Sequence, residues 1–61
     1  MSYYHQDENG HTRDKYGNYK DEAEVKQAAK DGVLTIYDCG KKAYNPETGE
    51  EFWADGTLRN I

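Results

Sequence analysis

Residues 43–52 decide the fold, and they read Ala-Tyr-Asn-Pro-Glu-Thr-Gly-Glu-Glu-Phe. The ring of Pro46 presets its φ for the second position of a type I turn, and Gly49 can adopt the positive φ that closes such a loop. The turn residues separate two short runs that contain aromatic side chains. This pattern predicts a β-hairpin.

The register of this hairpin decides which aromatic side chain enters the core. A four-residue loop would pair Tyr44 with Glu51 and Ala43 with Phe52, whereas a bulge would change these pairs. Phe52 and Trp53 are adjacent, so they point to opposite faces of a regular strand. We expect Phe52 in the core and Trp53 partly exposed, because the indole N–H of Trp53 needs water or a partner.

The segments on both sides of the hairpin continue the sheet. Residues 33–38, Val-Leu-Thr-Ile-Tyr-Asp, are rich in the β-branched and aromatic types typical of strands. Asp55-Gly56 is a second turn, after which residues 57–61 can return as a short last strand.

Residues 21–32 predict a short helix upstream of the sheet. Asp21 can accept a hydrogen bond from the first turn, and Glu24 follows three positions later, as in a capping box. Gly32 can end the helix in the left-handed conformation. A narrow apolar stripe would pack on the sheet, and it consists of Val25, Ala28 and Ala29.

The composition changes near residue 20. Residues 1–20 contain no Val, Ile, Leu, Phe or Trp, and their apolar content is one methionine and four tyrosines. Such a segment can bury little surface, so we expect residues 1–20 to form a flexible or irregular N-terminal arm. Residues 21–61 would then form the compact domain.

The predicted fold class is therefore α+β: a small single domain with one short helix packed on a three-stranded antiparallel meander, behind an irregular N-terminal arm. A core this small predicts a marginally stable monomer that a homodimer or a partner could complete. The candidate core residues are Val25, Ala28, Ala29, Val33, Leu34, Ile36, Tyr37, Tyr44, Phe52, Trp53, Leu58 and Ile61.

Charge, hydropathy and cysteine content indicate which partners and which compartment to expect. The chain carries 12 acidic and 8 basic residues, a formal net charge of −4. This charge disfavours electrostatic binding to the phosphate backbone of a nucleic acid. No apolar stretch approaches the ~20 residues of a membrane span, so we expect no membrane partner. The single Cys39 cannot form an internal disulfide, which favours a reducing compartment and a cytoplasmic location.

The sequence contains no catalytic or metal-binding pattern. Cys39, His5 and His11 have none of the spacings of a zinc site, and the run that begins at Asp7 fails the calcium-loop pattern. We therefore expect a non-enzymatic protein without cofactor or metal. Cys39 would be a small buried residue before a turn, and both histidines would be solvated.

The leading functional expectation is a small protein-binding module with a regulatory or inhibitory accessory role, of the kind that phages and mobile elements encode. Its contact surface would be the sheet face that the helix leaves uncovered, because exposed Tyr and Trp are frequent at interfaces. One alternative is a single-stranded nucleic-acid-binding module that uses the same aromatics, and another is a structural homo-oligomer. The candidate contact residues are Tyr37, Tyr44, Trp53 and Arg59.

Overall fold

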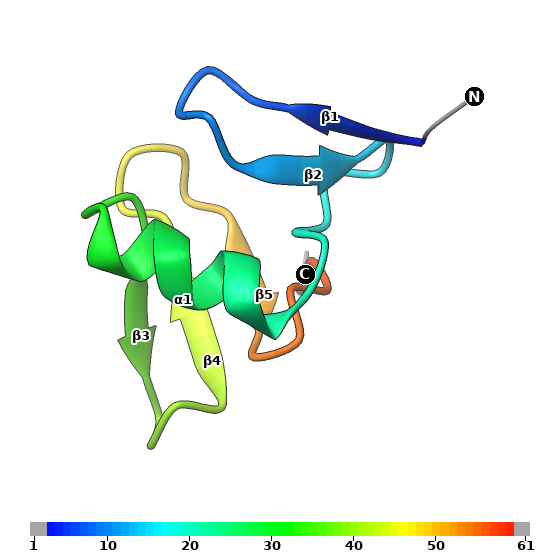
Figure 1. Ribbon diagram of the computed structural model, residues 1–61. Coiled ribbons are helices and arrows are strands. Elements are labelled where there is room, and N and C mark those ends of the chain that lie inside the picture. Colours follow the sequence, from blue (N-terminus) through cyan, green and yellow to red (C-terminus); the bar gives the residue numbers. More distant parts are fainter. Residues whose placement is uncertain (1–2, 60–61) are drawn as a thin grey trace.

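The computed structural model describes residues 3–59 of the 61-residue chain. One helix packs across a three-stranded sheet with strand order β3-β4-β5, and a separate two-stranded hairpin, β1-β2, lies at one end (Figure 1). The predicted α+β class and its antiparallel meander are confirmed, and the hairpin is an addition. The elements are β1 (Tyr4–Gln6), β2 (Thr12–Asp14), α1 (Glu22–Lys30), β3 (Thr35–Tyr37), β4 (Lys42–Tyr44) and β5 (Glu51–Trp53).

Helix α1 begins and ends as its capping residues predict. The Asp21 side chain accepts a hydrogen bond of 3.0 Å from the Glu24 N–H, which satisfies one of the free donors of the first turn. Gly32 has a φ of +83°, and its N–H donates to the Ala29 carbonyl. Val25 and Ala28 are the buried residues of the helix, so its apolar stripe faces the sheet as expected.

The β4–β5 hairpin has the register of a four-residue loop. Tyr44 pairs with Glu51 and Ala43 pairs with Phe52. The Asn45 side chain accepts hydrogen bonds from two N–H groups inside the loop, and Gly49 has a φ of +79°. The predicted last strand is reduced to an isolated bridge between Phe52 and Leu58, and residues 60 and 61 lie outside the described residues.

Two turns of the same construction organise the N-terminal segment: Asp7–His11 closes the β1-β2 hairpin, and Asp14–Asn18 follows β2. In each, the aspartate Oδ1 accepts from the backbone N–H groups two and four positions later. The aspartate carbonyl accepts from the glycine N–H three positions later. Residues 3–20 therefore contain regular structure where we expected an irregular arm, while the mobility of this segment stays a prediction.

Tyr19 joins that segment to the core. Its ring packs edge-to-face on Phe52 with 4.8 Å between centroids, and the Arg13 guanidinium lies 4.8 Å from the Tyr19 centroid. The Arg13 guanidinium also donates a hydrogen bond of 3.0 Å to the Glu50 carboxylate. The candidate core taken from the sequence omitted Tyr19, because a lone tyrosine in a polar segment has no periodicity that identifies a core residue.

The core is smaller than expected. Phe52 is fully buried and Trp53 is 45% exposed, so the predicted division between these two adjacent side chains is confirmed. Of the other candidate core residues, Tyr44 and Ile36 are exposed and Tyr37 is half-buried, so their inclusion in the core was wrong. Trp53 and Tyr44 alternate with Phe52 and Ala43 and so occupy the opposite sheet face, while Ile36 lies on the edge strand β3. The buried hydrophobic residues are Tyr19, Val25, Ala28, Leu34, Ala43 and Phe52, with Ala29, Val33 and Leu58 partly buried against them.

Candidate functional site: the outer face of the sheet

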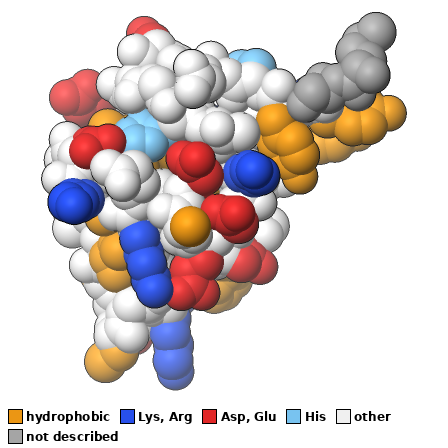
Figure 2. Space-filling model, viewed as in Figure 1, with side chains coloured by type: hydrophobic (Ala, Val, Ile, Leu, Met, Phe, Trp, Pro, Cys, Tyr) orange, Lys and Arg blue, Asp and Glu red, His pale blue; other side chains and the backbone are white. Residues whose placement is uncertain are grey.

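The face of the β3-β4-β5 sheet that points away from α1 carries most of the exposed aromatic side chains of the meander. We call it the outer face. Strand alternation and the observed register place two residues of each strand on it. These residues are Thr35 and Tyr37 from β3, Lys42 and Tyr44 from β4, and Glu51 and Trp53 from β5. On the opposite, helix side of the molecule, acidic and basic side chains are interspersed among neutral side chains and backbone (Figure 2).

Tyr37 lies at the centre of a hydrogen-bonded group on the outer face. Its ring meets the Tyr44 ring edge-to-face, with 5.6 Å between centroids. Its hydroxyl donates to Glu51 Oε1 at 3.1 Å and accepts from Arg59 at 3.2 Å. Partial burial, and then the hydrogen bond to the Glu51 carboxylate, raise the pKa of Tyr37, so its hydroxyl stays a donor. This group spans the sheet from β3 to β5.

Arg59 connects this group to Trp53. Its guanidinium donates to Glu51 Oε1 at 2.8 Å and lies 4.8 Å from the centroid of the Trp53 ring. The Lys42 ammonium lies 5.8 Å from the same ring. Trp53 remains 45% exposed, and it also borders a shallow hollow of about 380 Å³ next to the outer face, with Lys41 and Asp55 among the other lining residues. The indole therefore has two cations beside it while much of its surface faces solvent.

The structure brings all the predicted contact residues, Tyr37, Tyr44, Trp53 and Arg59, onto or beside the outer face. Sequence reasoning missed Glu51, which accepts hydrogen bonds from both Tyr37 and Arg59. The predicted hairpin register already placed Glu51 opposite Tyr44. Its contact with Tyr37, two strands away, depends on side-chain packing that the pattern does not encode.

His11 is 3% exposed, so its expected solvation was wrong. Its Nε2 atom lies 3.2 Å from an Asp31 carboxylate oxygen, and its Nδ1 atom lies 3.7 Å from Glu24. The Asp7 turn places the imidazole beside the two ends of α1. The buried His11 ring therefore packs the β1-β2 hairpin against α1.

Cys39 is exposed, so the expectation that it is buried was also wrong. It follows Asp38 in the β3–β4 turn, and both residues have positive φ values. A tight turn at the end of a sheet has no neighbouring element to cover its side chains. Among residues 3–59, no group of three His, Cys, Asp or Glu side chains is arranged to hold a metal ion.

Comparisons with models of known protein families, with characterised proteins and with solved structures found no match to this chain. Within residues 3–59, no helix has the length and apolar character needed to cross a membrane. The outer face is therefore interpreted from its own chemistry.

Proposed function

We propose that this chain is a small, non-enzymatic protein-binding module that docks on a protein partner through the outer face of its sheet. Its role would be that of a regulatory or inhibitory accessory protein, comparable to those that phages and mobile elements encode. Its place of action would be the cytoplasm, where the thiol of Cys39 stays reduced.

The observation that carries the proposal is the half-exposed position of Trp53 beside Arg59. Trp, Tyr and Arg are the residue types most enriched among the energetic centres of interfaces. Ordering exposed side chains on binding normally costs about 0.5–1.5 kcal/mol for each side chain. The contacts of Arg59 with Trp53, Tyr37 and Glu51 impose much of that order in the free protein.

Quantitative capture of partners from a lysate of the source organism tests the proposal. Trp53→Ala should reduce the recovery of a specific partner at least tenfold, because it removes the central aromatic surface. Ile36→Ala is the control, since Ile36 is an exposed apolar side chain that pairs with Ala43 and so lies on the opposite sheet face from Trp53. If Trp53→Ala retains the partner as well as the parent does, the outer face is not the contact surface.

One observation favours single-stranded nucleic acid as a second candidate. Lys42 and Arg59 place two cations beside the Trp53 ring, and nucleobases stack on aromatic faces that have cationic neighbours. A mobility-shift titration with single-stranded oligonucleotides at low and moderate salt distinguishes the two functions. Binding that is lost in Trp53→Ala would replace the protein-partner proposal.

A structural homo-oligomer is the remaining alternative, and it would also cover the outer face. Sedimentation at two protein concentrations separates it from the monomeric module. A mass that rises with concentration in the parent and stays monomeric in Trp53→Ala would assign the outer face to a second copy of the chain.

A further inference from the structure

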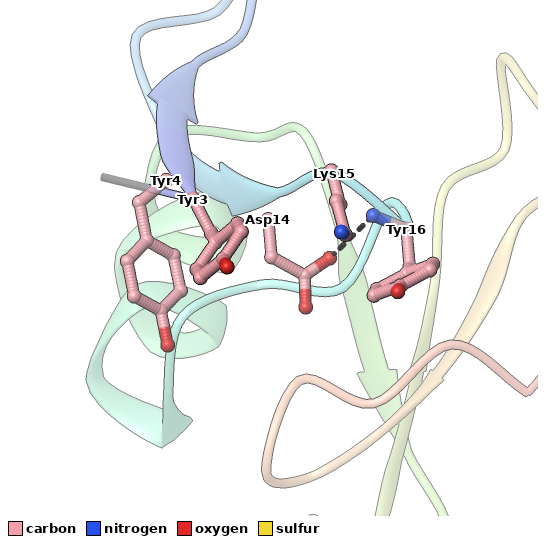
Figure 3. A pocket seen from close by; sticks show the side chains of 5 residues that line it. All are labelled: Tyr3, Tyr4, Asp14, Lys15 and Tyr16. Carbon is pink, nitrogen blue, oxygen red and sulfur yellow. Dashed lines mark hydrogen bonds between the residues drawn. The ribbon is translucent and has the colours of Figure 1, made fainter. Parts of the chain in front are cut away.

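A second aromatic site lies at the open end of the β1-β2 hairpin and shares no residue with the outer face. It is an open pocket of about 360 Å³ (Figure 3). Tyr3 and Tyr16 are each about 70% exposed, although large aromatic rings are usually at least partly buried. The pocket is lined by Tyr3, Tyr4, Asp14, Lys15 and Tyr16.

The chain's own Lys15 shows which ligand charge this pocket accepts. The Lys15 ammonium lies 4.8 Å from the centroid of the Tyr3 ring and 5.1 Å from the centroid of the Tyr16 ring. Both distances fall within the roughly 6 Å at which a cation is attracted to an aromatic face. The two rings are therefore already positioned on either side of a cation.

Asp14 adds a fixed negative charge to the same pocket. In the view of Figure 3 its carboxylate lies between the rings of Tyr3 and Tyr16. Partial burial raises the pKa of Asp14, but hydrogen bonds from Asn18 and Tyr16 outweigh it, and the net shift is downward. The carboxylate stays ionised at neutral pH. Aromatic faces and a carboxylate together favour a cation over an anion or a neutral group.

We propose that this pocket binds a methylated or quaternary ammonium group, which displaces the Lys15 ammonium from the rings of Tyr3 and Tyr16. Lys15 is exposed, so its ammonium can return to water. A primary ammonium is strongly hydrated and loses much of that hydration on entering an aromatic pocket. Methyl groups weaken the hydration and enlarge the contact with the rings, which is the basis of aromatic-cage recognition.

Choline and the trimethylated lysine side chain share this chemistry, and separate titrations distinguish them. The unlabelled ligands are choline and free Nε-trimethyllysine, and 3,3-dimethylbutan-1-ol is the neutral analogue that matches choline in shape. Resonances of Tyr3 and Tyr16 should shift saturably with at least one of the two cations and much less with the alcohol. The stronger cation identifies the source of the ligand. No saturable shift with either cation, or equal binding of the alcohol, would overturn the proposal.

Two variants with a matched control test the roles of the rings and of Lys15. Tyr16→Leu keeps an apolar side chain but removes one aromatic face, so the affinity should fall roughly threefold to thirtyfold. Lys15→Gln removes the competing ammonium, so the affinity should rise. Tyr44→Leu on the outer face should leave it unchanged. Unchanged binding by Tyr16→Leu, or weaker binding by Lys15→Gln, would reject the displacement of Lys15 by the ligand.

The site is independent of the proposed partner-binding surface, and the variants keep the two apart. All substitutions are at exposed side chains, and each variant is first compared with the parent by amide resonance dispersion. Loss of cation binding in Tyr16→Leu with full partner binding would separate the two sites. Loss of both activities in the same variant would reject their independence.

Discussion

The backbone of Gly56 lies directly against Tyr19. A Cβ atom on residue 56 would stand 2.7 Å from the Tyr19 carbonyl oxygen and 2.9 Å from the Tyr19 Cβ atom. The Tyr19 N–H donates to the Gly56 carbonyl at 2.8 Å in the same contact. Because Tyr19 is buried in the core, this contact attaches the N-terminal segment to the turn that follows β5.

Gly56→Ala should therefore destabilise the protein by about 2–4 kcal/mol. The φ of +96° strains any residue with a Cβ atom, and the contact with the Tyr19 backbone adds an overpacking cost. Gly40→Ala is the control, since its φ is +85° but, apart from its two chain neighbours, no atom of residues 3–59 lies within 4 Å of the added Cβ. It should cost about 1–2 kcal/mol. Chemical denaturation measures both, and equal midpoints would contradict the close approach of Gly56 to Tyr19.

Phe52→Ala and Trp53→Ala should have opposite consequences for folding. Phe52 is fully buried, and its truncation should cost about 3–5 kcal/mol, enough to unfold a marginal domain. Trp53→Ala should remain folded, because the indole lies on the outer face. Thermal unfolding of the two variants checks this, together with Trp53 fluorescence in the parent. Emission typical of a fully buried indole, with an unfolded Trp53→Ala variant, would reverse the face assignment.

Tyr19→Phe should leave stability unchanged or raise it by about 1 kcal/mol. The Tyr19 hydroxyl is buried, and within residues 3–59 no group pairs with it, so its loss removes an unpaired polar atom. Burial also raises the pKa of Tyr19. Tyr19→Ala should instead cost roughly 3 kcal/mol or more, because the ring packs on Phe52. A marked loss of stability in Tyr19→Phe would show that the hydroxyl has a partner in solution.

The turn aspartates predict a loss of stability in acid. Hydrogen bonds from Asn18 and Tyr16 outweigh partial burial and lower the pKa of Asp14, and a backbone hydrogen bond from Thr57 lowers the pKa of Asp55. A carboxyl group whose pKa is lowered by folding stabilises the protein at pH values above its ordinary pKa of ~3.9, and this stabilisation is lost as the pH falls through the folded-state pKa. The melting temperature should therefore drop below about pH 4.

Asp14→Asn tests this pH dependence, because an amide keeps an acceptor oxygen for the turn but does not titrate. Its melting temperature at neutral pH should be somewhat lower than that of the parent, and the drop between about pH 5 and 2 should be smaller. Identical acid profiles for variant and parent would mean that the Asp14 turn makes no contribution to the acid transition.

Sequence reasoning succeeded for the outer face where only alternation was needed. Once the hairpin register was known, Tyr44 and Trp53 had to lie on the sheet face that Ala43 and Phe52 do not occupy, because successive side chains in a strand alternate between faces. It did not reveal that Arg59 would lie on the Trp53 ring, or that Glu51 would pair with Tyr37. Those contacts depend on rotamers and on the return of the chain after Gly56, which sequence spacing does not specify.

The sequence by itself determined the local elements: the cap of α1 at Asp21, its end at Gly32, and the turn that closes at Gly49. Each depends on hydrogen bonds and φ preferences within about five residues, so the local residues suffice. Only the tertiary structure decided that Tyr19 and His11 are buried. His11 is buried beside both ends of α1, and Tyr19 is buried against Phe52 of β5. These are contacts between separate elements, and no local preference of a polar segment encodes them.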